Sequence, residues 1–506
     1  MNQLRKLFRG PPAKDKQNDK QNDKQNGEQN GEPDPAEAAK QSRRRKAILE
    51  GPLTKTLVTV SWPLVLSGQI GHVIGLIVLF WVARFGGSTG LEVWALLNPL
   101  TSLASLLISS TLNDGSGALI AQSVGAGDQR GLAVVRAALQ LTLLLCLGLL
   151  IPVALFSGPL AELLAGETGA AAPLIDFMLP WLLFAFPIAL ACDLLLGAIQ
   201  VSGWTAFGLF RIITDLAIMC SLIPLFMGVF GLGMMGPPLA SGVSAGVLAL
   251  LVWRTLRRHG PALGLGDDPG RFSSVDRGTW RRIVEIGLPP QLGRMATWIA
   301  QLVYVQMLAH GAGALVGGYG LAMEAMLVLG LFSMSLAWGT AIMIGQNMGA
   351  GQWQRGVGVL RRAAGVLATL LLVFLAWTPF ARPVFGLLSD DPAILDAAVA
   401  FLSIMRWGWI GMAIYQLLNA TYTAVGATKL AGVFVILSES LGVAFAVWWS
   451  ASSTSDGAVF EAVTYGFCLS CGVRAVLMLS LIRRSLLAPL AAAASKAASR
   501  SGVPMS

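Results

Sequence analysis

Apolar residues run along the chain in long stretches that do not alternate with polar positions. Divided at proline, glycine and charged residues, the sequence gives twelve apolar stretches of more than 20 residues each. A helix that crosses a bilayer needs about 20 mainly apolar residues, whereas a barrel strand needs about 10. The pattern therefore predicts an all-α integral membrane protein with twelve transmembrane helices. The predicted spans are 53–83, 91–123, 131–156, 171–201, 205–229, 234–256, 280–309, 315–348, 356–381, 392–422, 429–450 and 457–482.

One polar motif occurs twice. Residues 120–138 read IAQSVGAGDQRGLAVVRAA, and residues 344–364 read IGQNMGAGQWQRGVGVLRRAA. Each copy follows the second span of a six-span set, so the chain is predicted to consist of two six-helix bundles that arose by internal duplication, as in many secondary transporters. Glycine permits tight chain reversals, so the motif glycines are predicted to form equivalent turns. These glycines are Gly125, Gly127, Gly349 and Gly351.

The polar segments divide the chain into five parts. Residues 1–50 form a polar, repetitive tail without an apolar period, which is expected to be disordered. The N-terminal bundle covers 51–259, the linker 260–278, and the C-terminal bundle 279–485. Residues 486–506 are predicted to form a second polar tail.

Composition and charge agree with a membrane location. Hydrophobic residues make up 55 % of the chain, charged residues 12 %, and the mean hydropathy is +0.66. The net charge is +9, but 30 of the 36 Lys and Arg residues fall in the tails and in alternate loops. This distribution follows the positive-inside rule and leaves no basic face for nucleic acid. It predicts a multi-pass protein of the cytoplasmic (inner) membrane with both termini in the cytoplasm and the lipid bilayer as its surroundings.

The sequence shows no constellation typical of catalysis or of cofactor binding. GLGMMG at 231–236 matches a dinucleotide-binding pattern, but no strand precedes it and no suitably spaced acid follows it. Cys468 and Cys471 form a lone C-x-x-C in an apolar helix, where packing explains them better than zinc. We therefore expect no catalytic residue, no metal site, no cofactor and no enzymatic activity.

Several features together resemble the multidrug and toxic compound extrusion (MATE) family. They are the two glycine-rich motifs, Ser61-Trp62-Pro63 matched by Gly287-Leu288-Pro289, the Gly203 and Gly426 turns, and GVFGLGMMGPPLAS at 228–241. The resemblance covers about residues 52–485. It implies two bundles arranged as a V around a central cavity, and export of bulky, often cationic or amphipathic compounds against inflow of Na⁺ or H⁺.

The chain departs from the family at the coupling positions. Many members carry an acid in span 1 and an Asn/Asp pair in span 5. The corresponding positions here are Val78, Met219 and Ile223. The coupling residues of the family therefore cannot be transferred to this chain.

Other charged residues lie within the predicted spans. A charge in the bilayer costs at least about 2.5 kcal/mol, so each is a candidate for a functional role. Arg211 and Asp215 are four residues apart on one helix and could neutralise each other. The candidates for cation coupling are Asp114, Asp193 and Asp215, all in the first half; those for the substrate cavity are Glu324, Arg294 and Arg211. Glu324 could contact a cationic substrate or pair with Arg294. Arg406, Glu439 and Arg474 complete the set.

These observations favour an antiporter that is coupled to H⁺ or Na⁺ and acts as a monomer on small amphipathic substrates by alternating access. One alternative is a flippase for lipid-linked oligosaccharides, which would use Arg211, Arg294, Arg406 and Arg474 to line a basic cavity. Another is a channel or a non-transporting membrane scaffold, which the duplicated halves and the charges within the spans disfavour.

Overall fold

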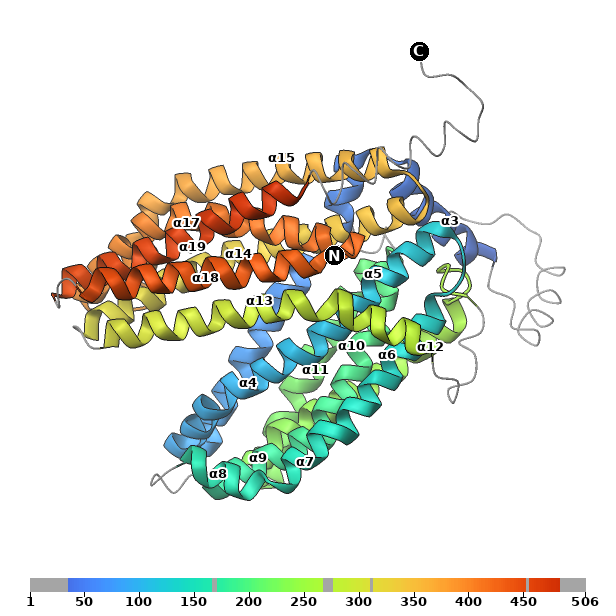
Figure 1. Cartoon of the computed structure of the whole chain (residues 1–506). Coiled ribbons are helices and arrows are strands. Elements are labelled where there is room, and N and C mark those ends of the chain that lie inside the picture. The colour runs from blue at the N-terminus through green and yellow to red at the C-terminus, as the bar shows by residue number, and fades with distance from the viewer. Residues whose placement is uncertain (1–34, 166–170, 267–275, 310–312, 452–454, 483–506) are drawn as a thin grey trace, which may run out of the picture.

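The molecule consists of two helical bundles that meet at one end and spread apart at the other (Figure 1). The computed structural model describes residues 35–165, 171–266, 276–309, 313–451 and 455–482. No strand occurs in these ranges. The long apolar segments form helices because a helix satisfies its backbone polar groups internally where no water is present.

The first half is blue to green in Figure 1. Its principal helices are α4 (Leu53–Ala104), α5 (Thr111–Ala126), α6 (Gly131–Leu145), α9 (Ala171–Pro180), α10 (Phe186–Val201), α11 (Thr205–Pro224) and α12 (Gly236–His259). Shorter segments between them are η1 (Ser105–Ser110), η2 (Cys146–Leu150), α7 (Ile151–Leu155), α8 (Ser157–Ala165), η3 (Trp181–Ala185), η4 (Leu225–Val229) and η5 (Gly233–Met235).

The second half is yellow to red and repeats this arrangement with fewer interruptions. Its helices are α13 (Arg277–Ala309), α14 (Gly313–Gly349), α15 (Trp353–Trp377), α16 (Ala381–Phe385), α17 (Pro392–Val425), α18 (Thr428–Ala451) and α19 (Asp456–Ile482), with η6 (Thr378–Phe380) between α15 and α16. Asp276 stands before α13 and accepts hydrogen bonds from the N–H and hydroxyl groups of Thr279. These bonds hold the pKa of the Asp276 carboxyl below its usual value.

The helix lengths agree with the predicted membrane protein. In the described residues, ten helical segments are long and apolar enough to cross a bilayer, and the first of them, Leu53–Ala126, has 74 residues. That segment is kinked at Gly87, which has φ 59° and ψ −147°. In Figure 1 the ribbon of this segment, in blue, runs to the lower left and turns back from there. It therefore supplies two spans. The ten segments do not include α13, although its 33 residues are long enough to span. With α13 added on the basis of its length, the described part of the chain agrees with the expected number of twelve.

Three π-helical segments lie beside prolines. Pro152 follows η2, Pro187 follows η3, and Pro224 precedes η4. Proline lacks the N–H that would continue an α-helical ladder, so the helix widens locally to π-helical hydrogen bonding.

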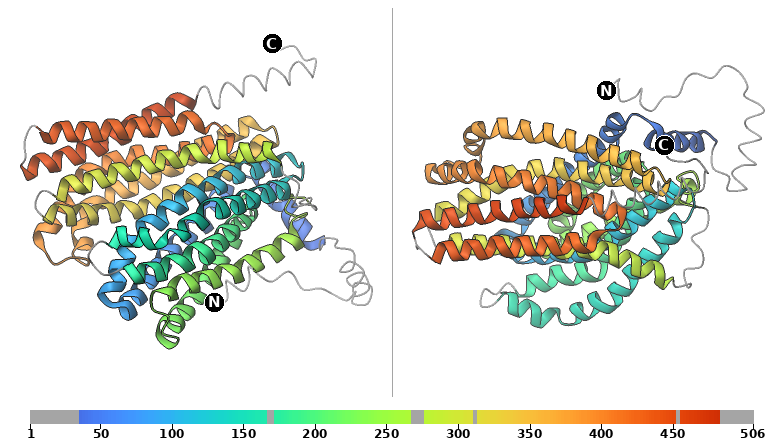
Figure 2. Two further views of the ribbon diagram at one scale, coloured as in Figure 1. Left: turned by 60° about the horizontal axis from the view of Figure 1, so that its bottom comes forward. Right: turned by 45° about the horizontal axis from the view of Figure 1, so that its top comes forward.

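The N-terminal tail differs from the expected disorder at its end. Residues 35–50 form the helix α3 (Pro35–Glu50), while 1–34 lie outside the described residues. Figure 2 shows α3, in dark blue, at the end where the two bundles meet. We call this end the junction end.

The repeated motif lies at the junction end, and its glycines have two different roles there. Gly127 and Gly351 follow α5 and α14 with φ 73° and 74°, a conformation that favours glycine. Gly125 and Gly349 are helical instead. A Cβ atom on Gly125 would lie 2.0 Å from the carbonyl oxygen of Gln346, and one on Gly349 would lie 2.0 Å from that of Gln122. The two helices therefore cross backbone against backbone.

A second pair of glycines extends this contact between the halves. A Cβ on Gly115 of α5 would lie 2.1 Å from the Ile283 carbonyl oxygen of α13, and one on Gly339 of α14 would lie 2.1 Å from the Ser61 hydroxyl of α4. We call Gly115, Gly125, Gly339 and Gly349 the crossing glycines. They allow four helices, two from each half, to approach more closely than side chains would permit.

The apolar cores of the two halves interlock near the junction. Ile48 and Leu57 from the start of the chain belong to the core of the second half. Ile283 and Ile286 from the start of α13 belong to the core of the first half. Each half thus lends residues from its beginning to the core of its partner.

We predict that Gly125→Ala and Gly349→Ala reduce both folding stability and transport. The added methyl group would overlap a backbone carbonyl, which cannot move aside as a flexible side chain can, and overpacking of this kind costs on the order of 1–3 kcal/mol. Gly365→Ala in α15 is the matched control, because a Cβ there meets nothing within 4 Å. Membrane abundance and thermal unfolding measure the effect. Wild-type values for both crossing variants would contradict the tight crossing.

Candidate functional site

An arginine and two aspartates form a cluster inside the first half. Arg211 of α11 lies 3.7 Å from a carboxylate oxygen of Asp193 on α10 and 3.7 Å from one of Asp215, one turn further along α11. The Ser244 hydroxyl of α12 donates a 2.6 Å hydrogen bond to Asp215. The side chains remain partly accessible, with exposed fractions of 41 % for Asp193, 13 % for Arg211 and 17 % for Asp215. With all three groups ionised, this triad carries a net charge of −1.

The second half contains a buried cluster around Glu439. Arg474 of α19 pairs with Glu439 of α18, and the Ser470 hydroxyl donates a 2.6 Å hydrogen bond to the same carboxylate. Arg474 also donates to the Ser438 hydroxyl at 3.3 Å and lies over the Tyr415 ring at 4.9 Å. The side chains of Arg474 and Glu439 are only 1 % and 7 % exposed. This pair is electrically neutral and largely buried.

The two clusters share part of their side-chain arrangement, as expected from the duplication. In each half, a carboxylate on the fifth span accepts a hydrogen bond from a serine on the sixth span and pairs with an arginine. Asp215 and Glu439 stand at similar distances from the matched turns at Gly203 and Gly426. The halves differ in two respects: the arginine comes from α11 in the first half and from α19 in the second, and only the first-half cluster has a second acid, Asp193. It leaves the first-half cluster with one uncompensated negative charge.

A third ionic contact joins the two halves. Arg294 of α13 lies 3.5 Å from the Asp114 carboxylate of α5. Gln291 donates a 2.8 Å hydrogen bond to Asp114 and accepts one of 2.8 Å from Arg294. Asp114 is buried. The pair lies beside the crossing glycine Gly115 and neutralises itself.

The structure shows which of the remaining charged candidates form ion pairs and which do not. Arg294 pairs with Asp114 and not with Glu324, so the expected alternative of a Glu324–Arg294 pair is not what the structure shows. Glu324 of α14 is exposed and makes no ion pair within the described residues. Arg406 donates a 2.8 Å hydrogen bond to the Thr378 hydroxyl. The nine charges thus divide into two clusters, one contact between the halves, and two separate side chains.

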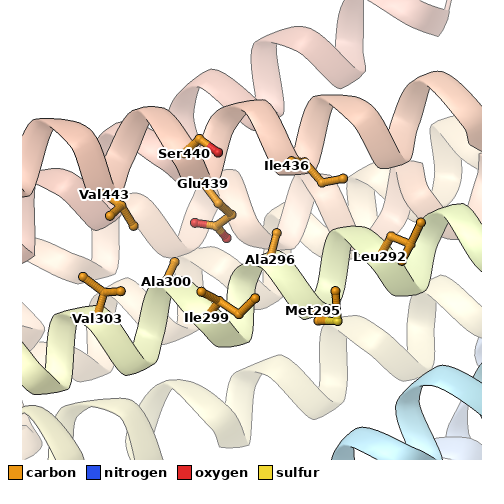
Figure 3. Close-up of a pocket in the computed structure, with 10 residues that line it drawn as sticks. All are labelled: Leu292, Met295, Ala296, Ile299, Ala300, Val303, Ile436, Glu439, Ser440 and Val443. Carbon is orange, nitrogen blue, oxygen red and sulfur yellow. The ribbon is translucent and has the colours of Figure 1, made fainter.

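An open groove of about 390 Å³ runs between α13 and α18. Figure 3 shows the Glu439 carboxylate turned toward α13 among apolar side chains. Glu439 is the single charged residue of its lining, which also includes Met295, Ile299, Ile436 and Val443. The groove is large enough for the apolar part of a small compound.

The repeated motif also supplies two hydrogen bonds that cross between the halves. Gln122 of α5 donates to the Ala424 carbonyl at the end of α17, at 2.7 Å. Gln346 of α14 donates to the Val201 carbonyl at the end of α10, at 2.6 Å. The two bonds are equivalent under the duplication, and each satisfies a carbonyl in the last turn of a helix, where intrahelical partners run out.

Comparison with known proteins places this architecture in a family. The MatE family model matches residues 63–225 and 289–448, which is more than half of the chain and one match in each half. The chain belongs to the MatE family of transporters. Transport as the function, rather than enzymatic catalysis, is therefore confirmed, as is the all-α fold.

Two known proteins are similar to this MatE protein over most of their length. It is 24 % identical over 402 residues to a probable multidrug resistance protein, YoeA, of Bacillus subtilis, with 76 % of this chain and 84 % of that protein covered. It is 27 % identical over 389 residues to an FAD transporter of Shewanella oneidensis, with 73 % and 82 % covered.

Solved structures show the same fold. A MOP superfamily transporter from Pyrococcus furiosus matches with a TM-score of 0.77 and 19 % identity over 87 % of this chain and 98 % of that chain. A MATE transporter in the bent conformation matches with a TM-score of 0.80 and 19 % identity over 89 % and 99 %.

The three positions that the family resemblance implies for cation coupling are apolar here and packed. Val78, Met219 and Ile223 are 7 %, 6 % and 0 % exposed and belong to the core of the first half. Because this region is closed and apolar, the nearby triad is the polar feature that this MatE half offers instead.

Sequence reasoning predicted the Arg211–Asp215 contact, which the structure confirms, but it missed the other partners of the charged residues. It named Glu439 and Arg474 separately, and it did not single out Ser244, Ser470 or Gln291. Side chains on different helices meet only through the packing, which a single sequence does not state. A signal did exist for Gln122 and Gln346, because both recur in the duplicated motif.

We predict that breaking the buried Glu439–Arg474 pair destabilises the protein more than removing it. Arg474→Met or Glu439→Gln leaves one charge alone in the core and should cost about 3–5 kcal/mol. The double variant Glu439→Leu with Arg474→Met should recover much of that loss. Arg382→Gln, which breaks the exposed pair with Asp396, is the control and should cost about 1 kcal/mol or less. Thermal unfolding in detergent distinguishes these outcomes; equal effects for the buried and exposed variants would contradict the assignment.

Proposed function

We propose that this transporter is a cation-coupled antiporter that exports amphipathic compounds across the cytoplasmic membrane, with Asp193 and Asp215 as the coupling carboxylates. The observation that carries the proposal is their shared arginine. The two acids share the single positive charge of Arg211, so a proton or Na⁺ is needed to bring the net charge of the cluster to zero. The Asp114–Arg294 and Glu439–Arg474 pairs need no such cation.

The cost of a charge within the bilayer explains how the net charge of the triad can couple cation binding to transport. An uncompensated carboxylate within a span is costly, and the cost falls when a cation binds. The cation-bound and cation-free triads therefore stabilise different packings of α10, α11 and α12. If the substrate binds better to the packing that the cation disfavours, the two ligands drive opposite steps of one alternating cycle.

Asp114 has a different role in this proposal. Its carboxylate is buried against Arg294 and Gln291 of the other half. It contributes to holding the halves together at the junction and takes up no coupling ion.

The arginines favour export of neutral or cationic compounds over flipping of an anionic lipid-linked glycan. Of the four arginines that a basic cavity would use, Arg211, Arg294 and Arg474 each face a carboxylate and offer no surplus positive charge to a phosphate. The fourth, Arg406, donates to the Thr378 hydroxyl and has no ion pair within the described residues, so a single arginine remains for such a contact. Glu324 is exposed and without an ion pair in the described residues, which suits contact with a cationic substrate. The apolar groove between α13 and α18 suits the non-polar part of such a molecule.

The basic residues support one orientation in the membrane. The junction end carries Arg43, Arg44, Arg45 and Lys46 of α3 and Arg257 and Arg258 at the end of α12. By the positive-inside rule, this end faces the cytoplasm.

We predict that Asp193→Asn and Asp215→Asn each abolish gradient-driven efflux while leaving substrate binding within about threefold of wild type, the order of a contact worth less than 1 kcal/mol. Asparagine keeps the volume but removes the negative charge that a cation neutralises. The measurement is efflux from everted vesicles with Na⁺ and pH gradients imposed separately, alongside substrate binding to the purified protein.

Asp176→Asn in α9 is the matched control, since it removes the same group from another helix of the same half. The control should transport normally with either gradient. Normal gradient-driven efflux in both triad variants would reject the triad as the coupling site. Efflux by the wild type that survives loss of both gradients but stops on ATP depletion would reject antiport itself.

A further inference from the structure

The helix α3 is part of neither bundle, although it touches both. It lies at the junction end, directly before α4 (Figures 1 and 2). Gly51 and Pro52 are the two residues that stand between α3 and α4. The position of α3 is fixed by its contacts over residues 43–51.

Two consecutive arginines of α3 contact the first half. Arg45 donates a 3.0 Å hydrogen bond to the Gly125 carbonyl in the last turn of α5, where carbonyls lack helical partners. Arg44 lies over the Trp204 ring, in the turn between α10 and α11, at 4.6 Å. A Cβ on Gly127 would lie 3.3 Å from Arg45, so the absence of a side chain there leaves room for the guanidinium.

The end of α3 is held more firmly by the second half. Asn347 donates to the Ile48 carbonyl at 3.4 Å, and Arg355 donates to the carbonyls of Ile48 and Gly51. The Ile48 side chain is 2 % exposed and belongs to the second-half core.

The duplicated motif shows that this arrangement is one-sided. Arg355 occupies the place in the second copy that Arg130 occupies in the first. Arg355 binds the end of α3, whereas Arg130 is exposed. On the first-half side, a space of about 420 Å³ also separates α3 from the linker, bounded by Arg45, Lys46 and residues 261–264.

From these contacts we infer that α3 is a strap across the cytoplasmic junction, anchored to the second half and releasable from the first. While Arg44 and Arg45 are bound, the strap adds to the Gln122 and Gln346 bonds and holds the junction closed. Opening toward the cytoplasm breaks the two arginine contacts and leaves the Arg355 and Ile48 contacts intact. The inference rests on alternating access as proposed above, but not on the identity of the coupling residues.

The test compares two double variants of the full chain that lose equal charge from the same helix. Arg44→Gln with Arg45→Gln removes the contacts to the first half. Arg43→Gln with Lys46→Gln is the control, because both side chains are exposed and Lys46 pairs within α3 itself, with Glu50. Nitroxide labels at Arg258→Cys and Gln354→Cys, exposed positions at the junction end of each half, report the separation by pulsed electron resonance in nanodiscs. The five native cysteines are first replaced by alanine, with transport verified.

The strap variant should show a longer distance component, with the ratio of open to closed molecules raised on the order of tenfold, as expected when a charged hydrogen bond and a cation–π contact are lost together. The control should match the unmodified strap. Arg45→Gln alone should give a smaller shift, and it carries the test if the double variant is not recovered.

Identical distance distributions for all variants, or equal shifts in the strap and control variants, would overturn the strap. Normal distances in the Asp193→Asn protein together with a shift in the strap variant would leave the strap standing independently of the coupling site.

Discussion

Close backbone contact at the crossing glycines is the constraint on which the rest of the structure depends. Gly125 against Gln346 and Gly349 against Gln122 bring α5 and α14 together without intervening side chains. The contact is equivalent for the two helices, because the glycine of each one packs against a backbone carbonyl of the other. The two helices are therefore related by a local symmetry axis at this point. The crossed hydrogen bonds of Gln122 and Gln346, the Asp114–Arg294 pair and the strap all lie on or near this contact, and the bundles spread only away from it.

The second constraint is the cost of charge in a bilayer, and the two halves meet it differently. The second half seals Glu439 with Arg474 and Ser470 and remains neutral. The first half keeps the same plan but adds Asp193 and leaves the cluster accessible. A duplicated framework can thus hold one half constant while the other responds to a cation, because one added acid changes the charge from zero to −1.

The sequence alone was sufficient to predict the transmembrane spans and the two halves. It was not sufficient to predict which side chains meet across different helices. Apolar stretches of more than 20 residues predict the spans, and the repeated motif predicts two halves, because both features are local along the chain. The Arg211–Asp215 contact was also predictable, since four residues separate the two side chains on one helix. The Asp193 contact, the Asp114–Arg294 pair and the burial of Ile48 depend on helices far apart in sequence. The polar composition of the tail gave no sign that its last turns would pack against both halves.

In the proposed mechanism, a single net negative charge, shared by Asp193, Arg211 and Asp215, couples transport to a cation. The most direct test of this mechanism is the coupling stoichiometry of the purified protein in proteoliposomes, obtained from the cation gradient that balances a known substrate gradient. With a net charge of −1 to neutralise, the exchange of one cation per transported molecule is expected. A stoichiometry of two or more, or a substrate gradient that no cation gradient can balance, would contradict it.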